Sequence, residues 1–205
     1  MAGKDISIGV LALQGAVREH LGMIEQCGAR GIGIKNPSGL DGINGLIIPG
    51  GESTTIGKLI DKYHFADGIR RLGVSGVPVF GTCAGLIIMA RRVKGRRGPI
   101  LELVDVTVER NAFGRQVESS ERDIKVRGIE EEERPFRAVF IRAPVIEEVG
   151  RNVVVMARQP EGVVMARDGN YLVSAFHPEL TGDPRVHRYF VDMVRANAGD
   201  RDVEV

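Results

Sequence analysis

Residues 77–93, VPVFGTCAGLIIMARRV, contain the stretch that decides the fold. Its first five residues predict a short buried strand, and the apolar residues from position 84 onward predict a helix. Cys83 lies in the turn between them, flanked by Gly81 and Gly85. Because glycine has no Cβ, a strand and a helix can approach closely there. A Gly-x-nucleophile-x-Gly turn is typical of a nucleophile elbow, although Cys83 can also be read as a buried apolar residue.

The first half of the chain repeats this alternation of strand and helix. Nearly continuous apolar runs predict buried strands, and apolar residues at helical spacing predict the helices between them. The expected strands are 6–13, 31–35, 45–50 and 77–81, and the expected helices are 16–29, 54–63, 65–72 and 84–93. Such alternation is typical of an α/β fold with a mainly parallel sheet.

Closely spaced strand candidates follow after about residue 100. They are 101–110, 137–144, 152–158, 162–167 and 170–176, with a hairpin turn at RDGN, 167–170. A last helix is expected over 184–198, with Asp183 as its N-cap and Pro184 at its first position. We therefore expect one domain, residues 1–205, with a three-layer fold in which helices flank a mixed, mostly parallel sheet.

Composition excludes several classes of partner. With 27% charged residues and a net charge of +1, the chain gives no electrostatic reason to expect nucleic acid or an anionic membrane. No apolar run approaches the roughly 18 residues of a membrane span. Cys27 and Cys83 form no disulfide framework, so a cytoplasmic location is expected. The charged runs 91–98 and 130–134 are interpreted as solvated loops.

The four histidines differ in their surroundings. His20, His64 and His187 fall within helical segments that carry long polar neighbours, so we expect them at the surface, and no pair has metal-ligand spacing. His177 instead directly follows a predicted strand, and Glu179 stands two residues further on. Residues i and i+2 of an extended chain share one side, so this carboxylate can orient the imidazole. Because parallel strands end at a common edge, Cys83 and His177 can meet as parts of a Cys-His-Glu triad.

Two backbone segments are candidates for stabilising an oxyanion. The amide of Ala84 follows Cys83 at the start of a helix, where free N–H groups also favour a thiolate. The stretch IIPGGEST, 47–54, ends another strand with two consecutive glycines. It is either a plain turn before a helix capped by Ser53 or Thr54, or a turn that directs its N–H groups at a ligand.

Three short motifs together resemble the class I, or triad, glutamine amidotransferase domain, a flavodoxin-like α/β fold. They are PGGES, GTCAG and FHPE, in this order. Longer blocks are similar to the family of glutaminase subunits of pyridoxal 5′-phosphate synthase. These blocks are GVLALQGAVREH, IPGGESTTIGKL, VPVFGTCAGLI, VTVERNAFGRQVESSE, AVFIRAP and SAFHPELTGD, and they extend from residue 9 to residue 183.

The resemblance implies a mechanism for the hydrolysis of L-glutamine. Cys83 is the implied nucleophile, His177 the acid and base, and Glu179 the group that orients His177. Backbone N–H groups of Gly51 and Ala84 are the implied oxyanion hole. The implied glutamine-binding residues are Gly50, Gly51, Glu52, Arg110, Ile141 and Arg142. For Arg110, a surface charge at a sheet edge is an equally good interpretation.

The resemblance also implies a partner. Ammonia is expected to pass through a tunnel to a (β/α)8-barrel synthase subunit, in an assembly of twelve synthase and twelve glutaminase subunits. Residues 12–16, ALQGA, are expected at that interface, and docking is expected to rearrange the PGG turn and to activate the glutaminase. No metal and no cofactor are expected, because pyridoxal 5′-phosphate is the product of the complex.

Two alternatives remain open from the residues. One is the glutaminase of another amidotransferase, such as imidazole glycerol phosphate synthase, which shares the triad but not LALQGA and VERNAFGRQ. The other is an α/β protein with a reactive cysteine and no glutaminase activity, such as a redox sensor or a chaperone.

Overall fold

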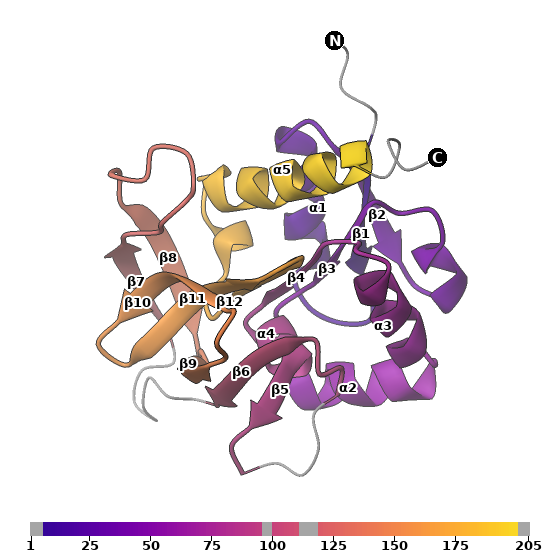
Figure 1. Ribbon diagram of the computed structural model, residues 1–205, viewed down its shortest axis with the longest axis horizontal. Helices are drawn as coiled ribbons and strands as arrows, with labels where there is room; N and C mark the ends of the chain where they lie inside the picture. The colour runs from indigo at the N-terminus through magenta and orange to yellow at the C-terminus, as the bar shows by residue number, and fades with distance from the viewer. Residues whose placement is uncertain (1–5, 96–99, 111–118, 201–205) are drawn as a thin grey trace.

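The computed structural model describes residues 6–95, 100–110 and 119–200, and it has three layers (Figure 1). Helices α1 and α5 cover one face of a large sheet, while α2, α3 and α4 cover the other face. The helices are α1 (Val17–Gln26), α2 (Ser53–Lys62), α3 (Ala66–Val74), α4 (Ala84–Met89) and α5 (Arg185–Asp200), with short 3-10 helices η1 (Pro37–Leu40) and η2 (Pro178–Leu180). The expected three-layer α/β fold is thereby confirmed.

One half of the sheet is parallel and buried. Its strands run in the order β2 (Arg30–Ile34), β1 (Ser7–Leu11), β3 (Gly45–Ile48), β4 (Val79–Thr82) and β12 (Tyr171–Ser174). Every residue of β3 and β4 is buried, which is why their sequences are continuous apolar runs rather than alternating ones. The carboxyl ends of β1, β3, β4 and β12 therefore converge on one edge.

The other half of the sheet is mixed. Beyond β12 the order continues through β11 (Gly162–Asp168), β9 (Val145–Val149), β6 (Val104–Glu109) and β5 (Ala90–Val93), and β10 (Val154–Gln159) also pairs with β11. The pairings of β11 with β12, β9 and β10 and of β9 with β6 are antiparallel. Strands β7 (Ser119–Ile124) and β8 (Phe136–Ile141) form a separate antiparallel ribbon.

Several sequence-based boundaries need correction. The helix expected over 84–93 ends at Met89, because residues 90–93 pair with β6 as strand β5. The charged run 91–98 therefore begins in an edge strand and not in a loop, and Arg91 forms an ion pair with Asp105 at 3.1 Å. Residues 96–99 lie outside the described residues.

Strands β7 and β9 were not expected at all. β7 reads SSERDI, and a strand that is polar and largely exposed carries little apolar signal. It exists because its whole length pairs with β8. β9 reads VIEEV and is completed by β6 and β11 on its two sides. Tertiary pairing decides both elements.

Other local expectations are confirmed. The hairpin at 167–170 joins β11 to β12, with Gly169 at φ 55° and Asp168 opposite Tyr171. Asp183 Oδ1 accepts a hydrogen bond from the Arg185 amide at 3.1 Å, where α5 begins. Residues 130–134 form an exposed turn region. Among the described residues, no helix combines the length and apolarity that a membrane crossing requires.

Candidate active site

Cys83 occupies a strained turn between β4 and α4. It has φ 47° and ψ −98°, a conformation that costs energy for a residue with a Cβ. A Cβ built on Gly85 would lie 2.1 Å from the Ile48 carbonyl oxygen, and one on Gly81 would lie 2.6 Å from Met89 Sδ. The two glycines are therefore required by close packing, as the sequence predicts. The Cys83 amide donates to the Ser174 carbonyl oxygen at 2.8 Å, which ties the elbow to β12.

His177 stands beside this elbow because β4 and β12 are neighbours. Thr82 pairs with Ser174 in the parallel register, so each catalytic candidate follows the end of an adjacent strand. The His177 amide donates to the Val139 carbonyl oxygen at 2.8 Å, and this bond holds the segment against β8. His177 is 7% exposed and Cys83 is 6% exposed, so both are shielded while retaining limited access to solvent.

Glu179 completes the expected triad. His177 Nδ1 lies 2.7 Å from Glu179 Oε1, and because a carboxylate accepts, Nδ1 carries the proton and Nε2 is left for Cys83. Burial by itself lowers the pKa of His177. The hydrogen bonds and charges of Cys83 and Glu179 outweigh burial and raise this pKa to about 10. At neutral pH the His177 ring is therefore a protonated imidazolium.

Gly50 provides the space in which Cys83 and His177 meet. A Cβ on Gly50 would lie 2.3 Å from His177 Cε1, 2.8 Å from His177 Nδ1 and 3.3 Å from Cys83 Cβ. Only glycine fits at this contact. The PGG turn thus packs directly on the side chains of Cys83 and His177.

The segment before α1 holds the PGG turn in place. The Ala16 amide donates to the Gly50 carbonyl oxygen at 3.2 Å, and the Glu52 amide donates to Gln14 Oε1 at 2.8 Å. On its other side, the Gly50 amide donates to Thr82 Oγ1 at 2.9 Å. Gly51, the expected oxyanion donor, is exposed between these anchors.

The cap of α2 differs from the expectation. Neither Ser53 nor Thr54 is the N-cap, because Glu52 takes that position. Its carboxylate accepts from the amides of Thr54 at 2.9 Å and Thr55 at 2.7 Å and from the Thr55 hydroxyl at 2.6 Å. The Thr55 hydroxyl, followed by the Thr54 amide, lowers the pKa of Glu52 to about 2. The Glu52 carboxylate is thus engaged in capping α2, directly after the PGG turn.

Of the expected glutamine-binding residues in the second half of the chain, the structure places Ile141 against the elbow. The Ile141 carbonyl oxygen is 3.8 Å from Cys83 Sγ, and Arg142 follows it, exposed and at φ 42°. Arg110 is exposed directly after β6, and its neighbour Glu109 pairs with Val145, three residues past Arg142. The two arginines therefore belong to the same edge. The rest of the ERNAFGRQ motif, residues 111–116, lies outside the described residues.

The expectation that His20 and His187 are surface residues is wrong. His20 is fully buried and His187 is 1% exposed, whereas His64 is exposed as expected, in a turn after α2. The helical spacing of apolar residues around His20 indicates that it is buried. His20 lies three residues after Val17 and four before Ile24, so it falls on the apolar face of its helix.

The buried histidines extend the triad inward. His20 Nδ1 lies 2.9 Å from His187 Nε2, and His20 Nε2 lies 3.2 Å from Thr82 Oγ1 and 3.5 Å from Glu179 Oε2. Burial, followed by the neighbouring histidines, lowers the pKa of His20, and burial lowers the pKa of His187 to about 3. Both rings are neutral at pH 7. In the described part of the chain, no three His, Cys, Asp or Glu residues are arranged to hold a metal ion.

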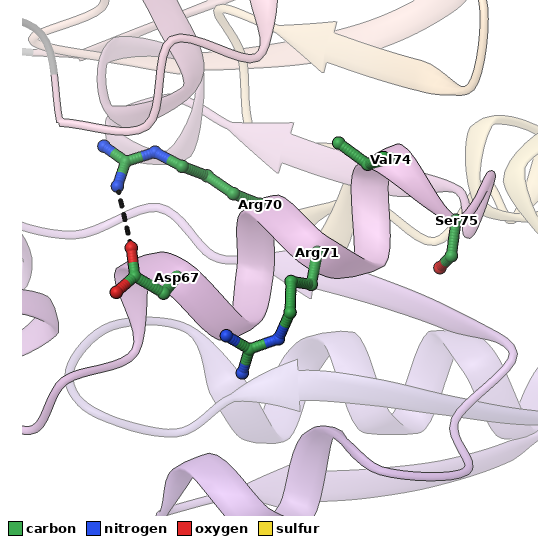
Figure 2. Close-up of a pocket in the computed structure, with 5 residues that line it drawn as sticks. All are labelled: Asp67, Arg70, Arg71, Val74 and Ser75. Carbon is green, nitrogen blue, oxygen red and sulfur yellow. Dashed lines mark hydrogen bonds and ion pairs between the residues drawn. The ribbon is translucent and has the colours of Figure 1, made fainter.

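A depression on α3 is separate from this constellation (Figure 2). It is lined by Asp67, Arg70, Arg71 and Val74 of α3 and by Ser75, the C-cap of that helix. Arg70 forms an ion pair with Asp67 at 3.3 Å and donates to the Ile100 carbonyl oxygen at 2.7 Å. Its polar groups thus serve local packing, and none of the sequence-predicted site residues lines it.

Comparisons with known proteins agree with this geometry. The model of the SNO glutamine amidotransferase family matches residues 10–196. The pyridoxal 5′-phosphate synthase subunit PdxT of Pelotomaculum thermopropionicum is 55% identical over 91% of this chain and 94% of its own, and that of Bacillus velezensis is 53% identical over 92% and 94%. A crystal structure of a glutamine amidotransferase, 46% identical, superposes with a TM-score of 0.85 over 91% of this chain and 98% of its own. The chain therefore belongs to the SNO glutamine amidotransferase family.

Proposed function

We propose that this chain is the glutaminase subunit of a pyridoxal 5′-phosphate synthase, which hydrolyses L-glutamine to L-glutamate and ammonia. The observation that carries the proposal is the arrangement of Cys83, His177 and Glu179 at one sheet edge, with Gly50 packed against the first two. The relatives that are more than half identical over most of the chain are pyridoxal 5′-phosphate synthase subunits, and this likeness supplies the pathway.

The first half of the reaction forms a thioester. At neutral pH the thiol proton already rests on His177, and the Cys83 sulfur attacks the side-chain amide carbon of glutamine as the carbonyl π electrons move onto oxygen. We assign this oxyanion to the amides of Gly51, in the PGG turn, and Ala84, the first residue of α4. When the intermediate collapses, the C–N bond breaks and His177 returns its proton to the departing nitrogen as ammonia.

The second half releases glutamate. His177 takes a proton from a water molecule, and the water oxygen adds to the thioester carbon. The C–S bond then breaks as the carbonyl re-forms, which frees the Cys83 sulfur beside the protonated His177 and restores the starting pair. Glu179 holds the imidazole in the tautomer that leaves Nε2 free for each transfer. Arg110 and Arg142 are cationic groups suited to the substrate's α-carboxylate. The proposed reaction uses side chains and backbone amides of this chain together with water, and no cofactor enters it.

We further propose that the ammonia passes to a (β/α)8-barrel synthase subunit, with twelve copies of each chain in the assembly. Residues 12–16 suit a role in sensing that partner, because Gln14 and Ala16 both bond to the PGG turn. A cytoplasmic location fits the need for a free thiol, and both Cys27 and Cys83 are free.

The decisive experiment is glutamine hydrolysis with and without the barrel subunit. We expect activity to rise when the barrel subunit is added and to vanish in Cys83→Ala. Full activity in that variant would refute the triad mechanism. Capture by a histidine-pathway cyclase in place of the barrel subunit would reassign the pathway.

A further inference from the structure

A buried chain of polar side chains lies behind the triad. It connects His187 to His20, His20 to Thr82 and Glu179, and Thr82 to the amide of Gly50. The members come from four elements distant in sequence: α1, β4, η2 and α5. All four side chains are at most 5% exposed. Burying polar groups this deeply costs free energy unless they hydrogen-bond to one another. This network of side chains is therefore a specific feature of the fold.

The proton positions in this network of side chains follow from those of its atoms that lack a hydrogen-bond partner. Among residues 6–95, 100–110 and 119–200, Glu179 Oε2 and His187 Nδ1 are buried and have no hydrogen-bond partner. If His20 carried its proton on Nδ1, His187 Nδ1 would hold an orphan N–H, and a His20 lone pair would face the Glu179 carboxylate. If His20 carries its proton on Nε2, that proton lies between Thr82 Oγ1 and Glu179 Oε2, and His187 donates to His20 Nδ1.

The second arrangement is favoured because an unmet buried carboxylate oxygen costs more than an unmet imidazole lone pair. The low pKa of both rings supports it, since each neutral ring has a single proton to place. His187 then fixes the tautomer of His20, in the same way that Glu179 fixes that of His177. The charged and titratable groups that face His20 are Glu179, His187 and His177.

We infer that His20 is a positioning residue whose Nε2–H holds the free oxygen of Glu179 and links it through Thr82 to the amide of Gly50. This inference rests on the proposed glutaminase function and adds a role that the triad itself does not include. One buried donor thereby couples the carboxylate that orients His177 to the turn expected to stabilise the oxyanion. His187 acts one step further back by holding the tautomer of His20.

Two amide substitutions separate this role from mere packing. In His20→Gln, the amide nitrogen falls near the position of Nε2 and can still donate to Glu179. In His20→Asn, the shorter amide matches Nδ1, so it keeps the contact with His187 and loses the one with Glu179. We expect His20→Asn to lower kcat by on the order of tenfold, the lower end of the range known for hydrogen-bond partners that orient metal-ligating histidines, which hold a ring in the same way. His20→Gln should recover most of the loss.

The direct readout is the pH dependence of Cys83 alkylation by iodoacetamide in the isolated chain, which requires neither glutamine nor partner. Without its donor, Glu179 holds the His177 imidazolium less well, so the acid limb of the alkylation profile should move to higher pH in His20→Asn. It should stay in place in His20→Gln. His64→Asn, at the exposed histidine, is the matched control and should leave the profile unchanged. Equal profiles for the two His20 variants would overturn the inference.

Thr82 provides a second test that does not depend on how His20→Asn folds. Thr82→Val keeps the shape of a β-branched strand residue but leaves the Gly50 amide and His20 Nε2 without their shared oxygen. Thr82→Ser keeps the hydroxyl. With the barrel subunit present, we expect Thr82→Val to lower kcat more than it changes KM, and Thr82→Ser to resemble wild type. Equal kcat in the two variants would refute the link to Gly50, whereas wild-type chain that hydrolyses no glutamine would refute the proposed function instead.

Discussion

Replacing Gly50 with alanine tests whether the PGG turn and the triad are in contact as the structure places them. The added Cβ would lie 2.3 Å from His177 Cε1 and 2.8 Å from Nδ1. Carbon atoms in contact are normally about 3.5 to 4.0 Å apart, so the ring or the turn must move by about 1 Å. The third neighbour, Cys83 Cβ at 3.3 Å, blocks one direction of escape.

A shift of this size falls on the reacting groups themselves. A displacement of about 1 Å from productive geometry costs on the order of a hundredfold in rate, so we expect kcat to fall by about that factor. Overpacking at a buried position also costs about 1–3 kcal/mol of unfolding free energy. The assay is steady-state glutamine hydrolysis with the barrel subunit, together with urea unfolding of the isolated chain.

Gly182→Ala is the matched control. Its Cβ would have no neighbour within 4 Å, and Gly182 is not a positive-φ glycine. We expect wild-type kcat and nearly unchanged unfolding from this variant. A Gly50→Ala enzyme with wild-type kcat would refute the packing of Gly50 on His177, because no alanine can occupy that position without displacing the imidazole.

Two further predictions concern the charged groups of the site. Because the folded pKa of His177 is about 10, above the ordinary histidine value of 6.5, its contribution to stability is complete below pH 6.5 and is lost as the pH rises toward 10. Glu179→Gln should lower the upper end of that window, seen as Tm against pH, and an unshifted window would show that Glu179 does not hold the imidazolium. Glu52→Ala should cost about 1 kcal/mol through the lost N-cap. Since the folded pKa of Glu52 is about 2, below 4.5, its stabilisation is present above pH 4.5 and is lost as the pH falls toward 2. The variant should flatten that part of the Tm curve, and an unchanged curve would contradict the capping role.

The local pattern of apolar residues was sufficient to predict the elements that are buried along their length. Six elements match their expected segments to within a few residues: strands β1, β3 and β4 and helices α1, α2 and α3. Each of them buries an apolar face, and the spacing of apolar residues in its own sequence shows that face. β5, β7 and β9 show the opposite case. Their sequences are polar or too short to show a period, and only pairing with β6, β8 and β11 makes them strands.

Some features of the candidate site could likewise be predicted from the sequence, and others could not. The order of GTCAG and HPE in the chain, together with the rule that parallel strands end at one edge, was enough to place Cys83, His177 and Glu179 together before any coordinates. The cap of α2 was not foreseeable, because Ser53, Thr54 and Glu52 can each accept a backbone N–H and only the path of the turn selects Glu52.

What the sequence by itself determined is the elbow, the triad and the layered α/β fold, because each depends on neighbours close in the chain or on strand order. Only the tertiary structure decided the partners of His20 and His187. These two residues are 167 positions apart, and their rings meet at 2.9 Å because α1 and α5 cover the same face of the sheet (Figure 1). Spacing along one helix can show that a histidine faces the core. It cannot show which buried carboxylate that histidine contacts, because the carboxylate, Glu179, belongs to another element, η2.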